Sequence, residues 1–424
     1  MGLGVVGGGV ARSLVEKADA IARSVGRPVR LTAALVQHPR KRRSDRPSGL
    51  RITTDPADVL DDPAVDIVVE VIGGEEPAFS YIQRALQHGK HVVTANKEVM
   101  AKHGPEVLAQ ALEHGLSVGF EASVGAGIPI IGPLLRELAA NEISSINAII
   151  NGTTNYMLTR MAGDGLDYDQ ALAEAQKLGY AEADPASDVE GVDAAYKLAI
   201  LSSLAFRSTV RDTDVYREGI GRLAPADFAY AAELGYAVKL VAISKRVGDA
   251  LQARVHPAFL PAAYPLAKVD GVYNAVVLEG DLVDWAMFQG PGAGALPTTS
   301  AVLGDVLAIA RSVATGSPAP PPPALDRGLK VQPMADLETK YYLRLRAYDR
   351  PGVMAQITRV LGDLGVSLAS VIQKEIIDAA TAAEIVITTH TARESAVQEA
   401  VAKLAALDVV LEVSNLVRVE DGAF

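Results

Sequence analysis

The feature that most constrains this chain is a group of glycines at its start, followed at once by a helical pattern. Gly2, Gly4 and Gly7 have the spacing Gly-x-Gly-x-x-Gly. In a dinucleotide-binding βαβ unit, this spacing lets the backbone approach a pyrophosphate at the N-terminus of a helix. A turn of small residues would show the same spacing, and the strand that should precede Gly2 is absent. The motif alone therefore leaves both interpretations open.

The residues that follow fit the βαβ unit. Apolar residues recur at helical spacing between residues 14 and 25, and residues 29–36 have the pattern of a buried strand. The second strand of such a unit usually ends in an acidic residue that binds the ribose of NAD. Here Arg40 and three further basic residues follow, which favours the 2′-phosphate of NADP without excluding NAD. A solvated basic loop is the alternative.

The chain divides into three predicted folded parts and a linker. Strand and helix patterns alternate over residues 1–122, which predicts a doubly wound α/β domain. Residues 123–311 are less regular and predict an α+β domain. Residues 312–338 contain a proline run typical of a stiff linker, and residues 339–424 follow the order βαββαβ of a ferredoxin-like module.

Composition excludes several classes of protein. The 424-residue chain has a net charge of −11, which argues against nucleic acid and anionic membranes as partners. No apolar run is long enough for a membrane span, and no basic segment of a signal peptide begins the chain. The chain has no cysteine, which excludes disulfides, thiolate metal sites and aldehyde oxidation through a thioester. The histidines show no His-x-x-x-His spacing of a zinc enzyme.

Two lysines are candidate catalytic residues, Lys197 as a proton donor and Lys97 as a contact for a substrate carboxylate or the nicotinamide. Asp193 and Lys197 are four residues apart and share one face of an apolar helix, so the carboxylate can hold the lysine as a proton donor. A surface ion pair is the alternative. Lys97 follows a strand pattern over residues 91–96, and the carboxyl ends of parallel strands are where doubly wound sheets bind ligands. A solvated lysine at a strand end is the alternative there.

Two loops of small residues are candidates for binding. Glu121 precedes the loop 122–129, whose carbonyl groups and carboxylate could hold a hard cation, although a hinge would have the same composition. The loop Gly290–Gly294 precedes a helix pattern and could cover a cofactor, or could be only a helix-entry turn.

Taken together, these segments resemble the homoserine dehydrogenase family, in its form with a C-terminal ACT domain. The matching motifs occur in family order over nearly the whole chain: residues 2–9, 69–74, 94–97, 121–129, 151–156, 179–185, 193–197 and 290–294. The resemblance implies a Rossmann domain, a substrate-binding and dimerisation domain whose last helix returns to the Rossmann domain, and a regulatory module. It also implies hydride transfer between a nicotinamide and the aldehyde of L-aspartate 4-semialdehyde, giving L-homoserine for threonine, methionine and isoleucine biosynthesis.

The resemblance implies a role for each candidate residue. Lys197 would donate the proton to the carbonyl oxygen, and Asp193 would orient Lys197 or a water molecule. Lys97 would lie beside substrate and nicotinamide. Glu182 would hold the substrate ammonium, with Thr153, Tyr180 and Asp188 near it. A sodium ion would bind Glu121 and the carbonyls of Val124, Ala126 and Ile128. The cofactor would contact Gly2, Gly4, Val5, Val6, Gly7, Arg40, Gly73, Gly74, Lys97, Gly292 and Gly294.

The C-terminal module resembles an ACT domain, which implies an amino-acid effector such as threonine. Asp349, Gly352 and Val353 form a turn at a helix N-terminus, a suitable seat for a carboxylate. A module that only dimerises is the alternative. We expect a cytoplasmic homodimer or homotetramer, with cofactor binding weakened by the absent first strand. A second hypothesis is an amino-acid-sensing protein whose Rossmann part no longer catalyses, and a third is a dehydrogenase for another small aldehyde.

Overall fold

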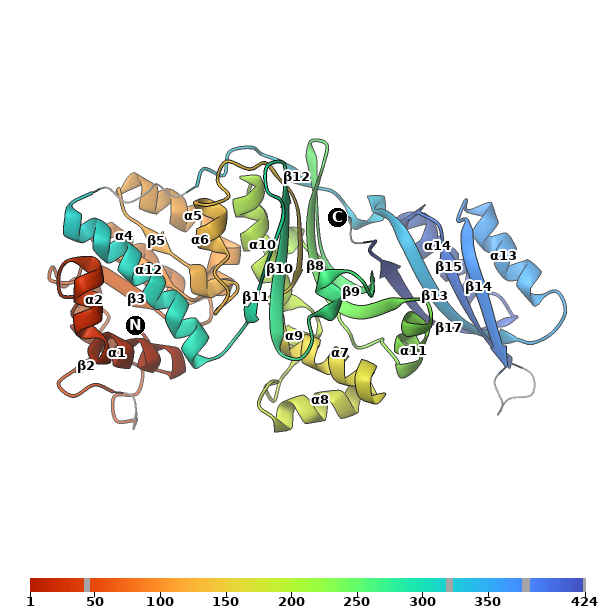
Figure 1. Cartoon of the computed structure of the whole chain (residues 1–424), viewed down its shortest axis with the longest axis horizontal. Coiled ribbons are helices and arrows are strands. Elements are labelled where there is room, and N and C mark those ends of the chain that lie inside the picture. Colours follow the sequence, from red (N-terminus) through yellow and green to blue (C-terminus); the bar gives the residue numbers. More distant parts are fainter. Residues whose placement is uncertain (42–45, 318–322, 376–381, 422–424) are drawn as a thin grey trace. The chain divides into compact units, whose positions relative to one another are not determined.

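The computed structural model describes residues 1–41, 46–317, 323–375 and 382–421 (Figure 1). The described residues form two compact units, each assembled from separate stretches of chain. Unit 1 contains Met1–Gly152, Asp193–Val215 and Tyr273–Lys330, and unit 2 contains Thr153–Val192, Tyr216–Val272 and Val331–Phe424. The compact units are therefore not consecutive stretches of sequence.

The first part of unit 1 has the predicted alternation of parallel strands and helices. Strands β1 and β2 pair in parallel, and β3, β4 and β5 form a second parallel set in that order. The strands are β1 (Ala33–Leu35), β2 (Arg51–Thr53), β3 (Ile67–Glu70), β4 (His91–Thr94) and β5 (Val118–Gly119). Each is shorter than its sequence pattern, because the pattern also includes the loops at the strand ends.

The first residues of the chain lie between these two sets of strands. The Gly2 N–H donates to the Leu35 carbonyl at 3.0 Å, and the Val71 N–H donates to the Met1 carbonyl at 3.0 Å. In the described residues, the first four residues lead directly into α1 (Val5–Glu16). These hydrogen bonds place the start of α1 at the carboxyl ends of β1 and β3.

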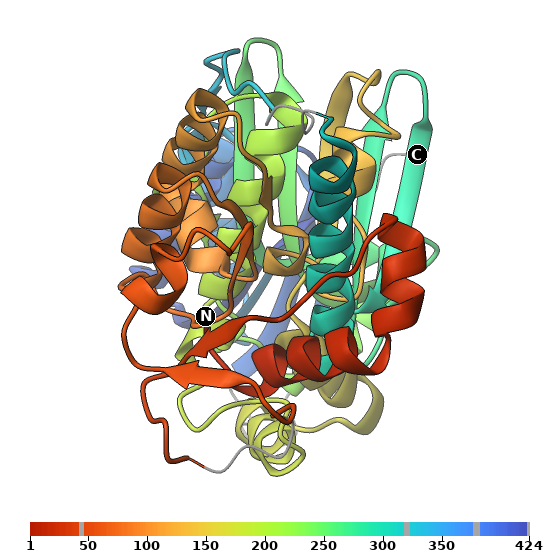
Figure 2. The same ribbon diagram turned by 90° about the vertical axis from the view of Figure 1, so that its left-hand side faces the viewer.

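Helices cover these strands (Figure 2). Helices α1, α2 (Ala18–Val25) and α12 (Ala295–Thr315) share one apolar cluster, in which Val10, Ile21 and Val306 are buried. The sequence pattern suggests one helix over residues 14–25. The structure has two helices there, because Lys17 departs from helical geometry between them. Helices α3 (Ala57–Leu60), α4 (Ala78–Gln87) and α5 (Lys97–Glu113) complete this part of the unit, with α4 and α5 packed together.

Helix α12 changes the predicted start of the linker. It continues to Thr315 and ends at Gly316, which has the left-handed conformation of a C-cap. Val313 packs against the same apolar cluster as Val306, so the helical spacing extends beyond residue 312. Residues 318–322 of the predicted proline linker lie outside the described residues.

The remainder of unit 1 contains an antiparallel set of strands and helix α10. Strand β10 (Tyr273–Gly280) pairs with β6 (Ile143–Ile149) on one side and with β11 (Asp284–Pro291) on the other. Helix α10 (Val192–Phe206) is buried over most of its length. The short helices are η1 (Glu121–Ser123), α6 (Ile131–Leu135) and η2 (Asp212–Asp214).

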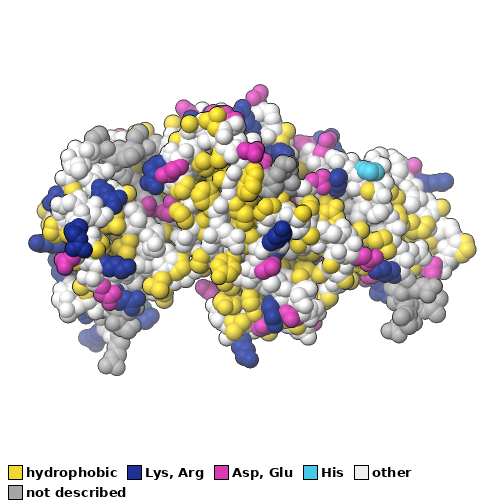
Figure 3. All heavy atoms as spheres, viewed as in Figure 1, with side chains coloured by type: hydrophobic (Ala, Val, Ile, Leu, Met, Phe, Trp, Pro, Cys, Tyr) yellow, Lys and Arg dark blue, Asp and Glu magenta, His cyan; other side chains and the backbone are white. Residues whose placement is uncertain are grey.

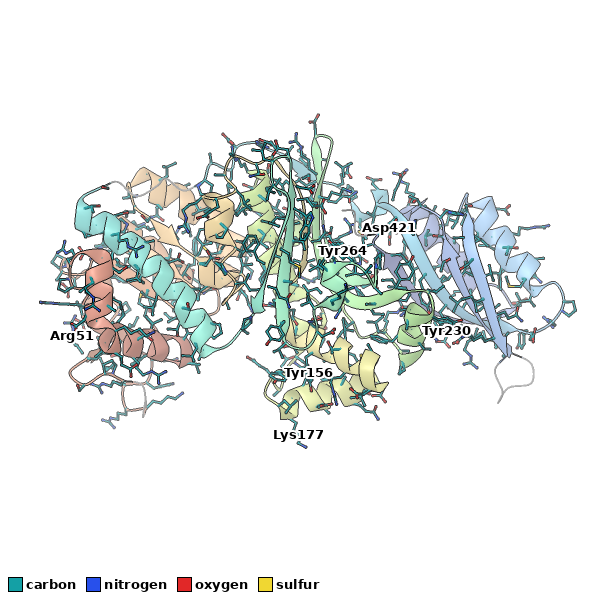
Figure 4. All side chains as sticks on the ribbon, viewed as in Figure 1. Arg51, Tyr156, Lys177, Tyr230, Tyr264 and Asp421 are labelled. Carbon is teal, nitrogen blue, oxygen red and sulfur yellow. The ribbon has the colours of Figure 1, made fainter. Side chains whose placement is uncertain are left out.

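Unit 2 begins with helices and continues with a long hairpin. Figure 4 labels Tyr156 on α7 and Lys177 at the end of α8, and the Tyr156 hydroxyl donates to Glu174 of α8 at 2.8 Å. The hairpin strands β8 and β9 are antiparallel over their full length. The elements are α7 (Gly152–Asp164), α8 (Tyr168–Lys177), α9 (Ala186–Val189), β7 (Tyr216–Arg217), α11 (Pro225–Glu233), β8 (Tyr236–Val247), β9 (Ala250–Pro261) and η3 (Pro265–Lys268).

The C-terminal module has the predicted βαββαβ order and an antiparallel sheet. Its strands lie in the order β17-β13-β15-β14, and Ile357, Leu361 and Leu404 of its helices are buried against them. The segment before the module contains β12 (Lys330–Val331) and η4 (Met334–Asp336). The elements of the module are β13 (Glu338–Tyr348), α13 (Val353–Asp363), β14 (Leu368–Glu375), β15 (Ala382–Thr389), β16 (Ala392–Arg393), α14 (Glu394–Ala405) and β17 (Val410–Val419). Strand β17 also pairs in parallel with β9.

Candidate active site

The glycines of the first loop have three different roles in the structure. Gly2 has φ +87°, and a Cβ there would lie 2.7 Å from the Val71 carbonyl oxygen. A Cβ on Gly7 would overlap the Gly2 carbonyl, so Gly7 allows α1 to pack on the turn. A Cβ on Gly4 would meet nothing within 4 Å. One glycine thus makes the turn, one permits close packing, and Gly4 leaves open the backbone that a pyrophosphate would approach.

The ends of β3 and β4 are held by buried polar side chains. The Glu70 carboxylate accepts the Ile72 N–H at 2.6 Å and the Thr94 hydroxyl at 2.6 Å. Asn96 caps α5 by accepting the Val99 N–H, and its Nδ2 donates to the Gly74 carbonyl at 2.7 Å. This network fixes both loops at the carboxyl edge of the strands, where ligands bind in such sheets.

These loops surround a cavity of about 360 Å³. The volume is within the usual range for small-molecule and cofactor sites. Its lining comes from the start of α1, the ends of β3 and β4, the start of α5, η1 with the loop after it, helix α10, and the loop before α12 with the start of that helix. The predicted cofactor residues Gly2, Gly4 and Gly7 are not among the lining residues. The lining residues are Val6, Val71, Ile72, Gly73, Gly74, Ala95, Asn96, Lys97, Glu98, Ala122, Ser123, Val124, Ala126, Lys197, Gly292, Ala293, Gly294 and Thr298.

Asp193 joins the two candidate lysines at this cavity. Its carboxylate pairs with Lys97 through Oδ1 and with Lys197 through Oδ2, the latter at 2.8 Å. The Lys197 ammonium also donates to the Ile150 carbonyl at 2.8 Å. The Asp193 and Lys197 side chains are 4% and 10% exposed, whereas the Lys97 side chain is 42% exposed. The predicted Asp193–Lys197 pair is therefore buried, unlike a surface ion pair.

The electrostatics of Asp193 follow from these contacts. Burial alone would raise its pKa, but Lys197 and Lys97 hold the pKa well below its ordinary value. The Asn151 Nδ2 donates to Asp193 Oδ2 at 2.9 Å and supports the ionised form. A carboxylate that stays ionised can hold a lysine ammonium in a fixed position at the cavity, ready to exchange a proton with a bound ligand.

The Glu121 side chain is bound by the start of α6. Its carboxylate accepts the N–H groups of Ile130, Ile131 and Gly132 at 2.6, 2.8 and 2.6 Å. The structure does not place the Glu121 carboxylate against a cluster of further acidic or histidine ligands, since no group of three such residues occurs among the described residues.

The predicted substrate-binding residues all belong to unit 2, whereas the residues that line the cavity belong to unit 1. The Thr153 hydroxyl donates to the Tyr180 carbonyl at 2.7 Å, which ties the start of α7 to the loop after α8. The Glu182 side chain is exposed, and its backbone carbonyl accepts Gln176 Nε2. Asp188 lies in α9. Thr153 and Tyr180 are thus brought together, with Glu182 two residues further along the same loop.

Several of the remaining predicted residues are at the surface, whereas Val353 is buried at the start of α13. Val5 and Arg40 are exposed and do not line the cavity, and the basic residues at 42 and 43 lie outside the described residues. In the C-terminal module, Gly352 has φ +89° at the start of α13, and Asp349 accepts Gln373 Nε2 at 3.1 Å. The turn predicted at the N-terminus of this helix is therefore present.

Two site residues were missed by sequence reasoning. Asn96 belongs to the matched segment 94–97, and Asn151 begins the matched segment 151–156. The sequence pattern gives neither residue a role of its own. Their contacts depend on residues far along the chain, Gly74 and Asp193, so local spacing gives no signal for them. Their position within the matched motifs was the available signal.

Three family models match the chain. The model of the homoserine dehydrogenase NAD-binding domain covers residues 2–121, that of homoserine dehydrogenase covers 129–307, and that of the ACT domain covers 341–409. The homoserine dehydrogenase of Neisseria gonorrhoeae is 42% identical, over 99% of this chain and 97% of the relative. The chain belongs to the homoserine dehydrogenase family. It is therefore an NAD(P)-dependent oxidoreductase that interconverts L-homoserine and L-aspartate 4-semialdehyde in amino-acid biosynthesis.

Solved structures agree with this membership. A homoserine dehydrogenase from Thiobacillus denitrificans superposes with a TM-score of 0.93 at 44% identity, covering 100% of this chain and 97% of that one. A hyperthermophilic archaeal homoserine dehydrogenase mutant, solved in complex with NADPH, has a TM-score of 0.59 at 28% identity and covers 73% of this chain and 95% of that one. The third predicted part is thus an ACT domain, and the first is a Rossmann-like nucleotide-binding domain.

Proposed function

We propose that Lys197 is the proton donor and acceptor of this homoserine dehydrogenase, held by Asp193, and that Lys97 contacts substrate and nicotinamide. The observation that supports this most directly is the Lys97–Asp193–Lys197 chain of ion pairs at the cavity wall. A nicotinamide cofactor, when bound, supplies or accepts the hydride. The chain itself then needs to deliver one proton to the carbonyl oxygen of the aldehyde, or to remove it from the hydroxyl of homoserine.

Lys197 suits this task because three features fix its ammonium. The Asp193 carboxylate and the Ile150 carbonyl hold it from two directions, and the side chain is largely buried. A fixed donor lowers the entropic cost of proton transfer. The pair Asp193–Lys197 shares one face of α10, so the helix itself sets the spacing between the two groups.

The test is the turnover of Lys197→Ala. We expect a loss of about 100-fold or more in turnover, while the affinity for cofactor changes little, because general acid–base catalysis typically contributes factors of that order. Lys102→Ala is a matched control, since Lys102 pairs with Glu75 and Glu98 rather than Asp193. Full turnover in the Lys197 variant would contradict the assignment.

We propose that Glu182 binds the substrate ammonium, with Thr153, Tyr180 and Asp188 shaping the loop. The exposed Glu182 carboxylate follows a loop that Thr153 anchors by its hydrogen bond to the Tyr180 carbonyl. The variant Glu182→Gln should raise the KM for homoserine and leave the affinity for cofactor unchanged, because a charge-assisted contact becomes a neutral one. An equal loss for both ligands would point to a folding defect instead.

We propose that the cavity of unit 1 holds the dinucleotide and that NADP is preferred over NAD. The first loop, with Gly2, Gly4, Val5, Val6 and Gly7, offers open backbone at Gly4, while Gly73, Gly74, Gly292 and Gly294 line the cavity. Arg40 follows β1, as expected for a residue that binds a 2′-phosphate. Specificity constants for NADP and NAD, measured on wild type and Arg40→Ala, test this: the variant should lose its preference for NADP.

We propose a sodium site on the carbonyls of Val124, Ala126 and Ile128, beside Glu121. Ala126 is a non-glycine residue with φ +48°, an uncommon conformation that turns the loop sharply. Activity titrated with sodium, potassium and lithium salts at constant ionic strength tests the site. Identical activity in all three salts would argue against it.

We propose that threonine binds the ACT domain at the turn with Asp349, Gly352 and Val353, and that the chain is a cytoplasmic homodimer or homotetramer. Exposed apolar side chains over β10 and β11, including Leu282 and Trp285, support self-association (Figure 3). None of the helices in the described ranges combines the length and apolar character needed to cross a membrane. Sedimentation with and without threonine, together with inhibition assays, tests both proposals.

We also propose the division into a Rossmann domain at 1–122, a substrate-binding and dimerisation domain from residue 123 to the end of α12 at Thr315, a linker from there to residue 338, and an ACT domain at 339–424. The family models lie within these bounds, with matches at 2–121, 129–307 and 341–409. Limited proteolysis should first cleave between residues 316 and 338.

A further inference from the structure

The loop between β11 and α12 closes one side of the cofactor cavity. Gly292 and Gly294 line the cavity, and Gly294 has φ +119° as the residue that precedes α12. The loop also contacts the segment after η1, since the Gly127 N–H donates to the Pro291 carbonyl at 3.2 Å. Whatever fixes this loop therefore affects the shape of the cavity.

Asn274 lies directly behind this loop. It is the second residue of β10 and pairs across the sheet with Gly290, the first glycine of the loop. The residue is 1% exposed. A Cβ on Gly292 would overlap the Asn274 carboxamide, so the loop backbone already touches this side chain.

The Asn274 carboxamide has no hydrogen-bond partner among the described residues, either for Nδ2 or for Oδ1. A buried donor and a buried acceptor that both lack partners destabilise a fold, so such groups are expected to find partners in the working state. The backbone N–H and carbonyl groups of the loop at Gly292 are candidates, because the carboxamide occupies the space beside the Gly292 Cα.

The position of Asn274 also relates the loop to the proton donor. Strand β10 pairs with β6 so that Ala275 is opposite Ile149. The next residue of that chain is Ile150, whose carbonyl holds the Lys197 ammonium. Asn274 therefore lies at the end of the sheet that carries one anchor of Lys197 and supports the loop over the cavity.

We propose that Asn274 is a positioning residue for the dinucleotide: its carboxamide hydrogen-bonds the backbone of the Gly290–Gly294 loop when the nicotinamide cofactor occupies the cavity, and holds the loop in its closed position. The proposal rests on the proposed dinucleotide site in unit 1. Asn274 acts through the loop and does not itself contact the reacting atoms.

The test compares Asn274→Leu with wild type in the free and cofactor-bound states. Leucine has a similar size and removes both unpartnered groups, so the melting temperature of the free variant should be equal to or above that of wild type. The Kd for NADPH should rise about 10-fold, the loss expected from one or two hydrogen bonds. The KM for homoserine at saturating cofactor should stay unchanged.

Ser202→Ala is the matched control. The Ser202 hydroxyl is also buried in unit 1 without a partner among the described residues, but it lies on α10 and not beside the loop. Its variant should bind NADPH like wild type. An unchanged Kd for NADPH in Asn274→Leu would overturn the proposal. A second result would also overturn it: a lower melting temperature of the free Asn274→Leu variant, together with an unchanged increase of the melting temperature on cofactor binding. The carboxamide would then already have hydrogen-bond partners before the cofactor binds, for example a buried water.

A second measurement covers the case in which Asn274→Leu does not fold. Asn274→Asp keeps the shape and removes both donor hydrogens. In hydrogen exchange, the backbone amides of residues 292–294 should become protected when NADPH binds to wild type. The gain in protection should be smaller in Asn274→Asp, and an equal gain in both proteins would overturn the proposal. Wild-type NADPH binding is measured first, because its absence would contradict the proposed cofactor site, whereas equal affinities of wild type and variant contradict only the role of Asn274.

Discussion

Replacing Arg418 by methionine should destabilise unit 2 more than any surface substitution. Arg418 on β17 is 1% exposed, and its guanidinium contacts Glu394 at 2.5 and 2.9 Å and Glu218 at 2.7 Å. Methionine keeps the unbranched chain and removes the charge. In the variant Glu394 stays buried and keeps two side-chain hydrogen-bond donors among the described residues, the Tyr341 hydroxyl and Gln398 Nε2.

The expected loss follows from the burial of the pair. Breaking a buried ion pair by removing one partner typically costs about 3–5 kcal/mol, because the other charge remains without compensation. We expect the lower part of that range at pH 7.5, since Glu394 keeps two hydrogen-bond donors. The double variant Arg418→Met/Glu394→Gln should recover part of the loss, because it removes both charges.

The loss should also depend on pH. Burial would raise the pKa of Glu394, but Arg418 holds it below its ordinary value of 4.5. A carboxyl group with a lowered pKa stabilises the fold above its unfolded-state pKa, and this contribution disappears as the pH falls through the folded-state pKa. The difference between wild type and Arg418→Met should therefore be full at neutral pH and shrink below about pH 4.

Urea denaturation followed by circular dichroism, together with calorimetry, measures these differences. Lys403→Met is the control, since Lys403 forms an exposed pair with Glu399 at 2.8 Å, and such pairs contribute less than about 1 kcal/mol. A loss below about 1 kcal/mol in Arg418→Met, or a double variant less stable than the single one, would refute the reasoning.

Three further outcomes are expected. Gly7→Ala should lower the stability of unit 1 by about 1–3 kcal/mol, because the new Cβ would overlap the Gly2 carbonyl. Gly4→Ala has open space around its Cβ, so it should weaken NADPH binding without lowering the melting temperature. Equal melting temperatures for the two variants would contradict this. Asp193→Asn should lower turnover by about 100-fold or more, because two lysines lose their counter-ion, and stopped-flow kinetics with wild-type rates would disprove it. Asn96→Ala should destabilise the start of α5 by about 1 kcal/mol and raise the KM for cofactor; an unchanged KM would show that the loop it holds is not part of the site.

The sequence predicted the parts of the site that depend on local spacing. Glycines two and three residues apart gave the first loop, and a four-residue spacing placed Asp193 and Lys197 on one helical face. The alternating patterns also predicted the order of elements in the C-terminal module. These features are encoded within a few residues, so a single sequence is enough to find them.

Contacts between distant segments could not be predicted in this way. Lys97 pairs with Asp193 across 96 positions of sequence. The return of α12 to pack on α1 at the start of the chain is expected from the family resemblance, and not from spacing within the sequence. The Glu121 carboxylate binds backbone N–H groups of α6, a partner that no residue type reveals. In each case the fold, and not the spacing, brings the groups together.

The hairpin strand β9 has one further consequence. Three short segments from different parts of the chain bind, one after another, to the edge of β9 that faces away from β8. Gln332 hydrogen-bonds to Leu251, β7 pairs with Arg254 and Val255, and β17 pairs with Ala258 and Phe259. An uncovered strand edge is a template for aggregation. Strand β17 of the ACT domain and Gln332 of the preceding segment therefore shield two of these three places, in addition to any sensing role. A chain cut after residue 330 should become less soluble rather than only unregulated.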